Sequence, residues 1–329
     1  MLNTAKTNYG IALLKVWLSF VVVTCHFYDG TGILAYPMKV AVPCFVALSF
    51  FFAESSFITK AKTITGSKIS RLLIPGFFWG GVYYLASLGM HTGATIKDLF
   101  YQLILGGDHL INPTLWYLYD TAIIMMLFMA IQRSDKKVYT WLRIILMVLC
   151  IVLQYSGINY DLFFKLPSDI HYSLGRIVEM IPAACVGSLL FDVLQKKRIT
   201  VALSASHGIP ALIIGSTMFW GSYYIPKMDI KGFGYQGLFI LVGVILLTGG
   251  FYGLNVPNHL KRPIAFVQQY GLGIYCIHMA VGKVAELVAQ KVLIPTGNLV
   301  ICFLIWSACI AGCVAIDMFT KKKARFLIS

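Results

Sequence analysis

Apolar runs of about 20 residues recur along this chain, separated by short segments that carry charges, Pro or Gly. As an α-helix, a run of that length crosses the hydrocarbon core of a bilayer. Of the 329 residues, 58% are apolar and only 12% are charged, which leaves too few polar side chains to cover a soluble globule. We therefore predict an all-α fold, a polytopic integral membrane protein with about ten transmembrane helices. No linker divides the chain, so residues 1–329 are expected to form a single membrane-embedded domain.

The predicted spans are bounded by charges, Pro or Gly. They are Tyr9–Tyr28, Pro37–Ile58, Arg71–Met90, Pro113–Gln132, Val138–Tyr155, Ser173–Leu194, Ile199–Trp220, Tyr235–Leu254, Val267–Ala289 and Asn298–Phe319. A further apolar segment, Thr95–Leu105, is too short to cross the membrane and is typical of an interfacial amphipathic or re-entrant helix. The first run has no cleavage-site pattern after it, so we expect the protein to retain it as a span.

Basic residues are unevenly distributed between the loops. The chain has 27 Lys and Arg against 13 Asp and Glu. About 17 of the basic residues fall in one alternating set of loops and about 5 in the other, and such an excess marks the cytoplasmic side. Both termini are therefore predicted to be cytoplasmic, in a multi-pass protein of the cytoplasmic membrane. This placement favours membrane lipids, not nucleic acid, as partners of the positive charge.

Two ionisable side chains lie inside the first span, Lys15 and His26. On a helix they are about 20° apart around the axis and about 16 Å apart along it, so they share one face. Because a charge within a membrane is costly, such residues are functional candidates. We predict a polar path along this face, with an imidazole near its outer end that can exchange a proton. In the alternative, Lys15 reaches the inner headgroups and His26 only caps the outer interface.

Other polar side chains in the spans allow two interpretations each. Arg176 and Glu179 are three residues apart, so they can pair on one helix face or line a cavity. A lone histidine such as His278 hydrogen-bonds a neighbouring helix or takes part in chemistry. Trp116 and Tyr117 suit either an aromatic belt or stacking against a sugar ring.

The sequence contains no motif for a metal or a nucleotide cofactor. Its eight cysteines all lie in apolar runs and form no CxxC pair, which is typical of cysteine as a small buried hydrophobe. No HExxH, Walker or dinucleotide-binding pattern occurs. We therefore expect no metal site and no permanently bound cofactor.

The pattern of Lys15, ten intervening residues and His26 is similar to the (R/K)-x10-H signature in the first helix of the acyltransferase-3 family of integral membrane acyltransferases. Later segments resemble the family's other motifs in the same order. They are Val42–Phe52 with Ser49, Lys68–Gly80 with Arg71, Asn112–Ile123 with Trp116 and Asp120, and Gly271–Val281 with Tyr275 and His278. The resemblance extends over nearly the whole chain.

This resemblance implies an O-acyltransferase that moves an acyl group, commonly acetyl, from cytoplasmic acyl-CoA to a hydroxyl of an extracytoplasmic glycan or glycolipid. His26 would be the general base and Lys15 would steady the donor. The acyl donor would be bound by Lys68, Arg71 and Ser49. The acceptor would be bound by Trp116, Tyr117, Asp120, Arg176, Glu179, Tyr275 and His278.

Other mechanisms and functions remain as alternatives. In a covalent relay, Cys25 or Ser19 would carry the acyl group. Helical geometry disfavours both, because Cys25 is turned about 100° from His26 and Ser19 lies about 10 Å from it along the axis. A proton-coupled transporter or exporter of a lipid-linked glycan or small solute would use Lys15 and His26 as a relay, although the sequence shows no repeat of the kind that many transporters carry. A third possibility is a non-catalytic membrane partner.

Overall fold

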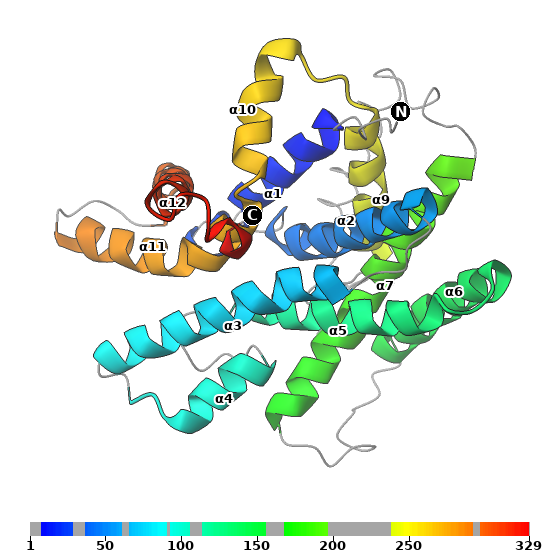
Figure 1. Ribbon diagram of the computed structural model, residues 1–329, viewed down its shortest axis with the longest axis horizontal. Helices are drawn as coiled ribbons and strands as arrows, with labels where there is room; N and C mark the ends of the chain where they lie inside the picture. The colour runs from blue at the N-terminus through cyan, green and yellow to red at the C-terminus, as the bar shows by residue number, and fades with distance from the viewer. Residues whose placement is uncertain are drawn as a thin grey trace. The chain divides into compact units, whose positions relative to one another are not determined.

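The computed structural model describes residues 8–28, 37–60, 66–90, 93–105, 114–155, 168–196, 238–291 and 297–328 (Figure 1). In these ranges the regular structure is helical and contains no strand. The helices are α1 (Tyr9–Phe27), α2 (Pro37–Lys60), α3 (Gly66–Gly89), α4 (Ile96–Leu105), α5 (Trp116–Ile131), α6 (Lys136–Tyr155), α7 (Ser168–Lys196), α9 (Leu238–Gly253), α10 (Asn258–Gln268), α11 (Gly271–Lys291), α12 (Leu299–Phe319) and a final 3-10 turn, η3 (Arg325–Leu327). The all-helical fold expected from the sequence is thus confirmed for the described residues.

The chain forms two compact units. The first comprises Met1–Phe45, Asp192–Asp229 and Gly237–Ser329, and the second comprises Val46–Phe191 and Ile230–Gln236. Helices α1 and α9 to α12 belong to the first unit and α3 to α6 to the second, while α2 and α7 contribute residues to both. The assignment of the whole chain to one functional domain stays a prediction.

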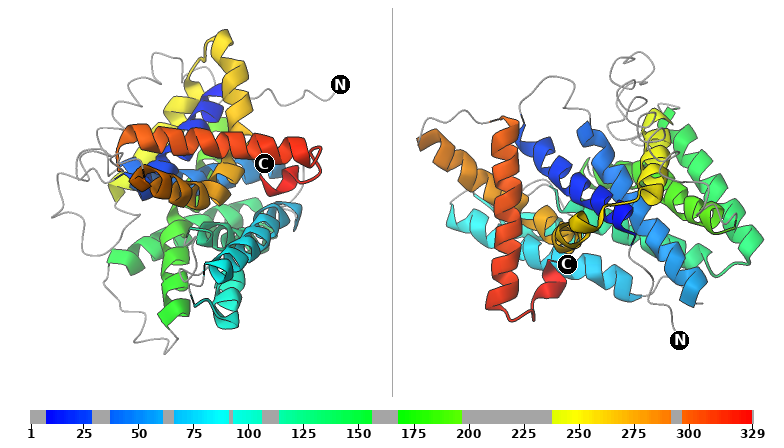
Figure 2. Two further views of the ribbon diagram at one scale, coloured as in Figure 1. Left: turned by 90° about the vertical axis from the view of Figure 1, so that its left-hand side faces the viewer. Right: turned by 90° about the horizontal axis from the view of Figure 1, so that it is seen from above.

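Helix α1 is the centre of the first unit, where it contacts α9, α10, α11 and α12. Its side chains at Leu14, Leu18 and Val23 are completely buried. The indole of Trp306 on α12 donates a hydrogen bond to Ser19 Oγ at 3.0 Å, which ties α12 to the middle of α1. Helix α12 also crosses α11, the helix with which it packs most extensively (Figure 2).

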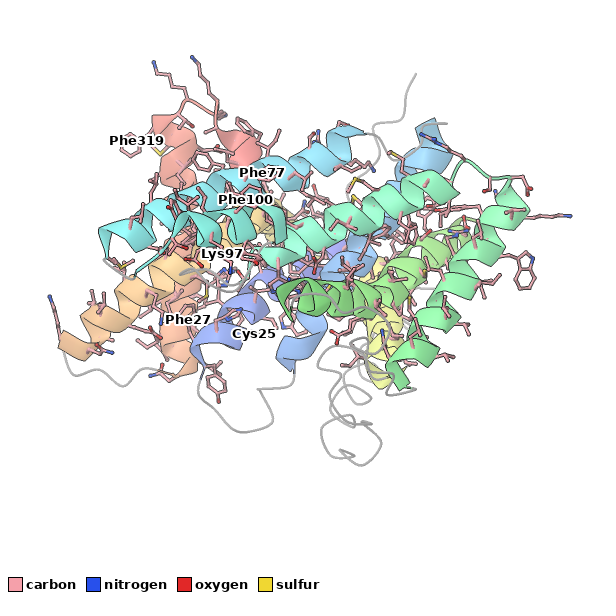
Figure 3. All side chains as sticks on the ribbon, turned by 90° about the horizontal axis from the view of Figure 1, so that it is seen from below. Cys25, Phe27, Phe77, Lys97, Phe100 and Phe319 are labelled. Carbon is pink, nitrogen blue, oxygen red and sulfur yellow. The ribbon has the colours of Figure 1, made fainter. Side chains whose placement is uncertain are left out.

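In the second unit, α3 packs along α5, and the short α4 lies against both (Figure 1). The ring of Phe77 on α3 meets Tyr119 on α5 edge to face, with centroids 5.6 Å apart. Helix α4 begins with a capping box, in which the backbone N–H of Thr95 donates to Asp98 Oδ2 at 2.7 Å and that of Asp98 donates to Thr95 Oγ1 at 3.3 Å. Phe100 is exposed on α4 (Figure 3).

Each predicted span that falls on described residues overlaps a helix. Six helical segments have the length and apolar composition to cross a membrane: Tyr9–Phe27, Gly66–Gly89, Lys136–Gln154, Leu174–Val193, Gly271–Lys291 and Leu299–Phe319. Shorter apolar helices cover Ala41–Glu54, Trp116–Ile131 and Ile240–Gly253. The predicted span Ile199–Trp220 lies outside the described residues, so the count of ten and the orientation of the termini stay predictions.

Several boundaries differ from the sequence prediction, and α7, for example, begins at Ser168 where Ser173 was predicted. The span expected at Val267–Ala289 begins at Gly271, because α10 occupies Asn258–Gln268 and the chain turns at Gln269 and Tyr270. Helix α3 begins at Gly66, five residues before the predicted start at Arg71. Lys68 therefore lies in the first turn of the helix.

Glycine at position 187 allows α7 to approach α2 closely. A Cβ atom there would lie 1.9 Å from the backbone oxygen of Ala47. We predict that Gly187→Ala lowers the free energy of unfolding by about 1–3 kcal/mol, because a backbone carbonyl cannot move aside as a side chain can. Unfolding by SDS in mixed micelles, followed by tryptophan fluorescence, measures the change.

The matched control is Gly175→Ala in the same helix, where a new Cβ would meet no atom within 4 Å. This variant should be neutral or slightly stabilising, since alanine favours a helix over glycine. Equal stability of the two variants would contradict the close approach of α7 to α2.

Candidate functional site

The first candidate group lies in the first unit on α1. Lys15 and His26 both lie in α1, which is continuous from Tyr9 to Phe27. Their spacing therefore places them on one face of this helix, as predicted. Lys15 is half-buried, whereas the His26 ring is exposed. Between them, Ser19 Oγ donates to the backbone oxygen of Val16 at 2.7 Å and accepts from Trp306. With both roles of its hydroxyl engaged in helix packing, Ser19 is poorly suited to be a nucleophile.

Two histidines distant in the sequence come together at the end of α1. The rings of His26 and His278, the latter on α11, have centroids 5.2 Å apart with an angle of 42° between their planes. The ring of Phe27 meets His278 edge to face at 6.5 Å, and Tyr275 lies 5.9 Å from it. His26, Tyr275 and His278, three residues that the sequence selected separately, thus form one aromatic cluster.

The buried member of this cluster has one engaged and one unengaged nitrogen. His278 is completely buried, and its Nδ1 lies 2.6 Å from the backbone oxygen of Tyr275. Because a carbonyl oxygen only accepts, Nδ1 carries the proton and donates. No hydrogen-bond partner reaches Nε2 within the described part of the chain. A buried acceptor without a partner is uncommon, and it marks this ring as a candidate for interaction with a further group.

A glycine sets the distance between α1 and α11. A Cβ atom at Gly282 would lie 1.9 Å from the Phe27 ring. Cys25 and Phe27 both lie in the last turn of α1, on either side of His26 (Figure 3). The side chain of Phe27 therefore fixes the rotation of this turn against α11, and with it the position of His26.

The second candidate group lies in the second unit, on α5 and α7. Arg176 Nε is 3.3 Å from Asp120 Oδ2, and both side chains are buried. The guanidinium also covers the Trp116 ring at 4.8 Å from its centroid. The sequence indicated Glu179 as a partner for Arg176 by helical spacing, but the close ion pair of Arg176 reaches across to α5. Arg176 thus occupies one face of the Trp116 ring, and a sugar cannot stack on that face.

Ser49 on α2 and Tyr117 on α5 also meet within the second unit. Their hydroxyl oxygens are 3.5 Å apart, and either can donate. The sequence assigned Ser49 to the donor and Tyr117 to the acceptor, and the structure joins the two as neighbours. This contact links the second-helix motif to the Trp116 segment, since Trp116 and Tyr117 are consecutive.

The predicted donor-binding cations lie at the start of α3. Lys68 Nζ donates a hydrogen bond to the backbone oxygen of Phe52 on α2 at 3.2 Å. Arg71, three residues on, is exposed. At that spacing the two cations share one face of the helix.

A buried ionic network in the second unit was missed by the sequence analysis. Glu54 on α2 lies 3.7 Å from Arg143 on α6, with both side chains at most 2% exposed. Tyr139 donates to Glu54 Oε2 at 2.9 Å and Ser188 donates to the same oxygen at 3.2 Å, while Gln132 donates at 3.4 Å. Both charges lie inside predicted spans. Lys15 was selected because it is an ionisable residue within a span, and the same criterion would have selected Glu54 and Arg143.

A second missed cluster lies in the first unit, around Asp317 on α12. Tyr270 donates to Asp317 Oδ2 at 3.1 Å, and Arg325 Nε lies 3.7 Å from the same oxygen. Arg325 also donates to Gln269 Oε1. Burial raises the pKa of the Tyr270 phenol and the neighbouring Asp317 carboxylate raises it further, so the phenol keeps its proton and donates. Asp317 also lies within a predicted span, so its charge could have identified it from the sequence.

Cysteines and acidic groups do not gather into a metal-binding arrangement among the described residues. All eight cysteines are free thiols, and seven of them are buried. This agrees with their interpretation as small core side chains.

The long apolar helices, with charged side chains paired between them, define a multi-pass helical membrane protein. The family model described as an acyltransferase domain matches residues 8–318, nearly the whole chain. The chain therefore belongs to the acyltransferase-3 family and is a membrane acyltransferase. No curated protein and no solved structure matches it. The family expected from the sequence motifs is confirmed.

The Glu54 network predicts a large effect on stability. Glu54→Gln removes the charge that faces Arg143 and leaves a buried cation uncompensated, at a cost of about 3–5 kcal/mol in the free energy of unfolding. Adding Arg143→Met should restore part of the loss, since neither charge then remains buried. SDS unfolding in mixed micelles measures both variants.

The control is Glu286→Gln, which breaks the exposed Lys283–Glu286 pair of α11 and should change little. If Glu54→Gln behaves like this control, the network does not hold the helices together.

Proposed function

We propose that this protein is an O-acyltransferase of the cytoplasmic membrane that transfers an acyl group, most simply acetyl, from cytoplasmic acyl-CoA to a hydroxyl of an extracytoplasmic glycan or glycolipid. Family membership supports acyl transfer, and the juxtaposition of the exposed His26 with the buried His278 supports histidine-based proton transfer. The cytoplasmic donor and the extracytoplasmic acceptor are what the family resemblance implies, and the distribution of basic loop residues predicts which helix ends face the cytoplasm.

In the proposed reaction, His26 takes the proton from the acceptor hydroxyl as its oxygen attacks the thioester carbonyl carbon. The carbon–sulfur bond then breaks, and the coenzyme A thiolate receives the proton from the His26 imidazolium. The products are an ester and free coenzyme A, so charge and protons balance. Lys15 lies about 16 Å from His26 along the helix axis, too far to stabilise the oxyanion at the same carbon. Its role is to steady the donor.

Donor binding is assigned to Lys68, Arg71 and Ser49. Coenzyme A carries several phosphates, and a fixed pair of cations on one helix face suits them. The exposed guanidinium of Arg71 is available for bidentate contact, whereas the Lys68 ammonium donates in addition to a backbone carbonyl. No cofactor is held between turnovers, since acyl-CoA enters as a substrate.

Acceptor binding is assigned to the Trp116 segment together with the residues around it. Trp116, Asp120 and Arg176 form a rigid group whose charges are already paired. Such a group orients neutral hydroxyls through hydrogen bonds without attracting anions. Tyr117 and Glu179 of the second unit are assigned to the acceptor from the sequence, and so is Tyr275 of the first unit.

Loss of the base should abolish acylation. We predict that His26→Ala lowers the ester content of cell-envelope glycans to that of cells without the protein, since general-base catalysis contributes roughly 100- to 10,000-fold. NMR of purified glycans measures the ester content. His259→Ala, at an exposed histidine of α10, is the control and should leave acylation unchanged. Unchanged acylation in His26→Ala would end the assignment of His26 as the base.

Removal of the donor-binding cations should weaken acyl-CoA binding selectively. We predict that Lys68→Gln and Arg71→Gln each raise the KM for acetyl-CoA about tenfold with little change in kcat, because each removes one charge-assisted contact to phosphate. The assay follows thiol release from acetyl-CoA by purified protein given de-esterified envelope glycan. Lys137→Gln, which removes an exposed cation at the start of α6, is the control. An equal KM in all three variants would contradict a phosphate site on α3.

A further inference from the structure

His278 is the least explained residue of the histidine cluster. It is completely buried, its Nδ1–H donates to the carbonyl of Tyr275, and its Nε2 has no partner among the described residues. A histidine that serves only in packing engages both nitrogens or leaves one in water. Here neither applies. The unengaged nitrogen has a lone pair, and the centroid of the His26 ring is 5.2 Å from that of His278.

The distance between the two rings suits a direct hydrogen bond. Two imidazoles joined by an N–H···N bond of about 2.9 Å have centroids about 5 Å apart. The observed separation of the two ring centroids is 5.2 Å, with an angle of 42° between the planes. His26 is exposed, whereas His278 is buried, lies edge to face with Phe27 and donates to the Tyr275 carbonyl. Catalytic hydrogen bonds are often unaligned before substrate binds.

We propose that His278 is a positioning residue for His26: its Nε2 accepts the N–H of one His26 nitrogen and so directs the other, unprotonated nitrogen towards the acceptor hydroxyl. This inference rests on the proposed role of His26 as the base. After proton transfer His26 carries a positive charge, which the Nε2 lone pair of the neutral His278 stabilises. The arrangement follows the general rule that a third group orients a catalytic base. It replaces the role of acceptor ligand that the sequence indicated for His278.

Charge and burial explain why His278 acts as an acceptor and does not serve as a second base. A second cation, fully buried and 5.2 Å from the first, would be strongly disfavoured in a low-dielectric interior. Its own proton is held by the Tyr275 carbonyl on the side away from Nε2. His278 therefore keeps one tautomer throughout the reaction.

Two variants of similar length test the role of Nε2. Glutamine at position 278 keeps a hydrogen-bond acceptor at the end of the side chain, whereas methionine fills the space without a strong one. We expect His278→Met to lower kcat at least about tenfold with the KM for acetyl-CoA within about twofold, and His278→Gln to retain most of kcat. The assay is thiol release from acetyl-CoA with de-esterified envelope glycan, and His259→Gln is the control.

A second readout does not depend on acyl transfer. Diethyl pyrocarbonate modifies the unprotonated nitrogen of histidine, and peptide mass spectrometry follows its rate at His26. The rate should fall several-fold in His278→Met and be preserved in His278→Gln. Equal losses of rate and of kcat in both variants would indicate a purely structural role and overturn the proposal. Unchanged values in both would also overturn it.

A third test uses the wild-type protein and therefore does not depend on whether a variant folds. His278–Met279 is the only His-Met pair in the chain, so labelling these two residue types isolates its signals in solid-state NMR. A neutral ring with its proton on Nδ1 is expected, and a proton on Nε2 would overturn the proposal. If His26→Ala leaves acylation intact, the proposed function itself fails. If His26→Ala abolishes acylation while the position 278 variants match wild type, only this inference fails.

Discussion

A charged side chain inside a membrane-spanning helix must find its partner within the protein, because lipid supplies neither water nor counter-ions. In this protein that requirement joins helices that are distant in the sequence. Glu54 and Arg143 link α2 to α6, and Asp120 and Arg176 link α5 to α7. Apolar surface gives no directional preference among helices in lipid, so these pairs select which helices meet and at which height.

The same requirement explains the histidine cluster. A histidine buried on α11 needs a donor and an acceptor near it, and the Tyr275 carbonyl satisfies only one of its nitrogens. The ring of His26 on α1 lies next to the His278 ring, with centroids 5.2 Å apart. In the proposed arrangement, the contact that would satisfy the second nitrogen of His278 would also orient His26 for acyl transfer.

Sequence reasoning reached most of the elements and some of the site. Helix α1 begins and ends within one residue of its predicted span, because an apolar run bounded by polar residues defines its own ends. Lys15 and His26 were found by their spacing on one helix. Glu54, Arg143 and Asp317 were missed although they lie inside predicted spans. They belong to none of the family motifs, and their ionic partners are distant in the sequence or lie outside the spans. The break between α10 and α11 was missed although Gln268 and Gln269 interrupt the apolar run there.

The sequence by itself determined the class of protein, the family and the helices on described residues other than α10, since hydropathy and helical periodicity are local properties of the chain. Only the tertiary structure decided the partners: Asp120 as the close ionic partner of Arg176, Tyr117 beside Ser49, and His278 beside His26. These contacts join residues separated by many helical turns. In lipid, the faces that contact protein and the faces that contact hydrocarbon are equally apolar, so the pattern along one helix cannot indicate which other helix covers it.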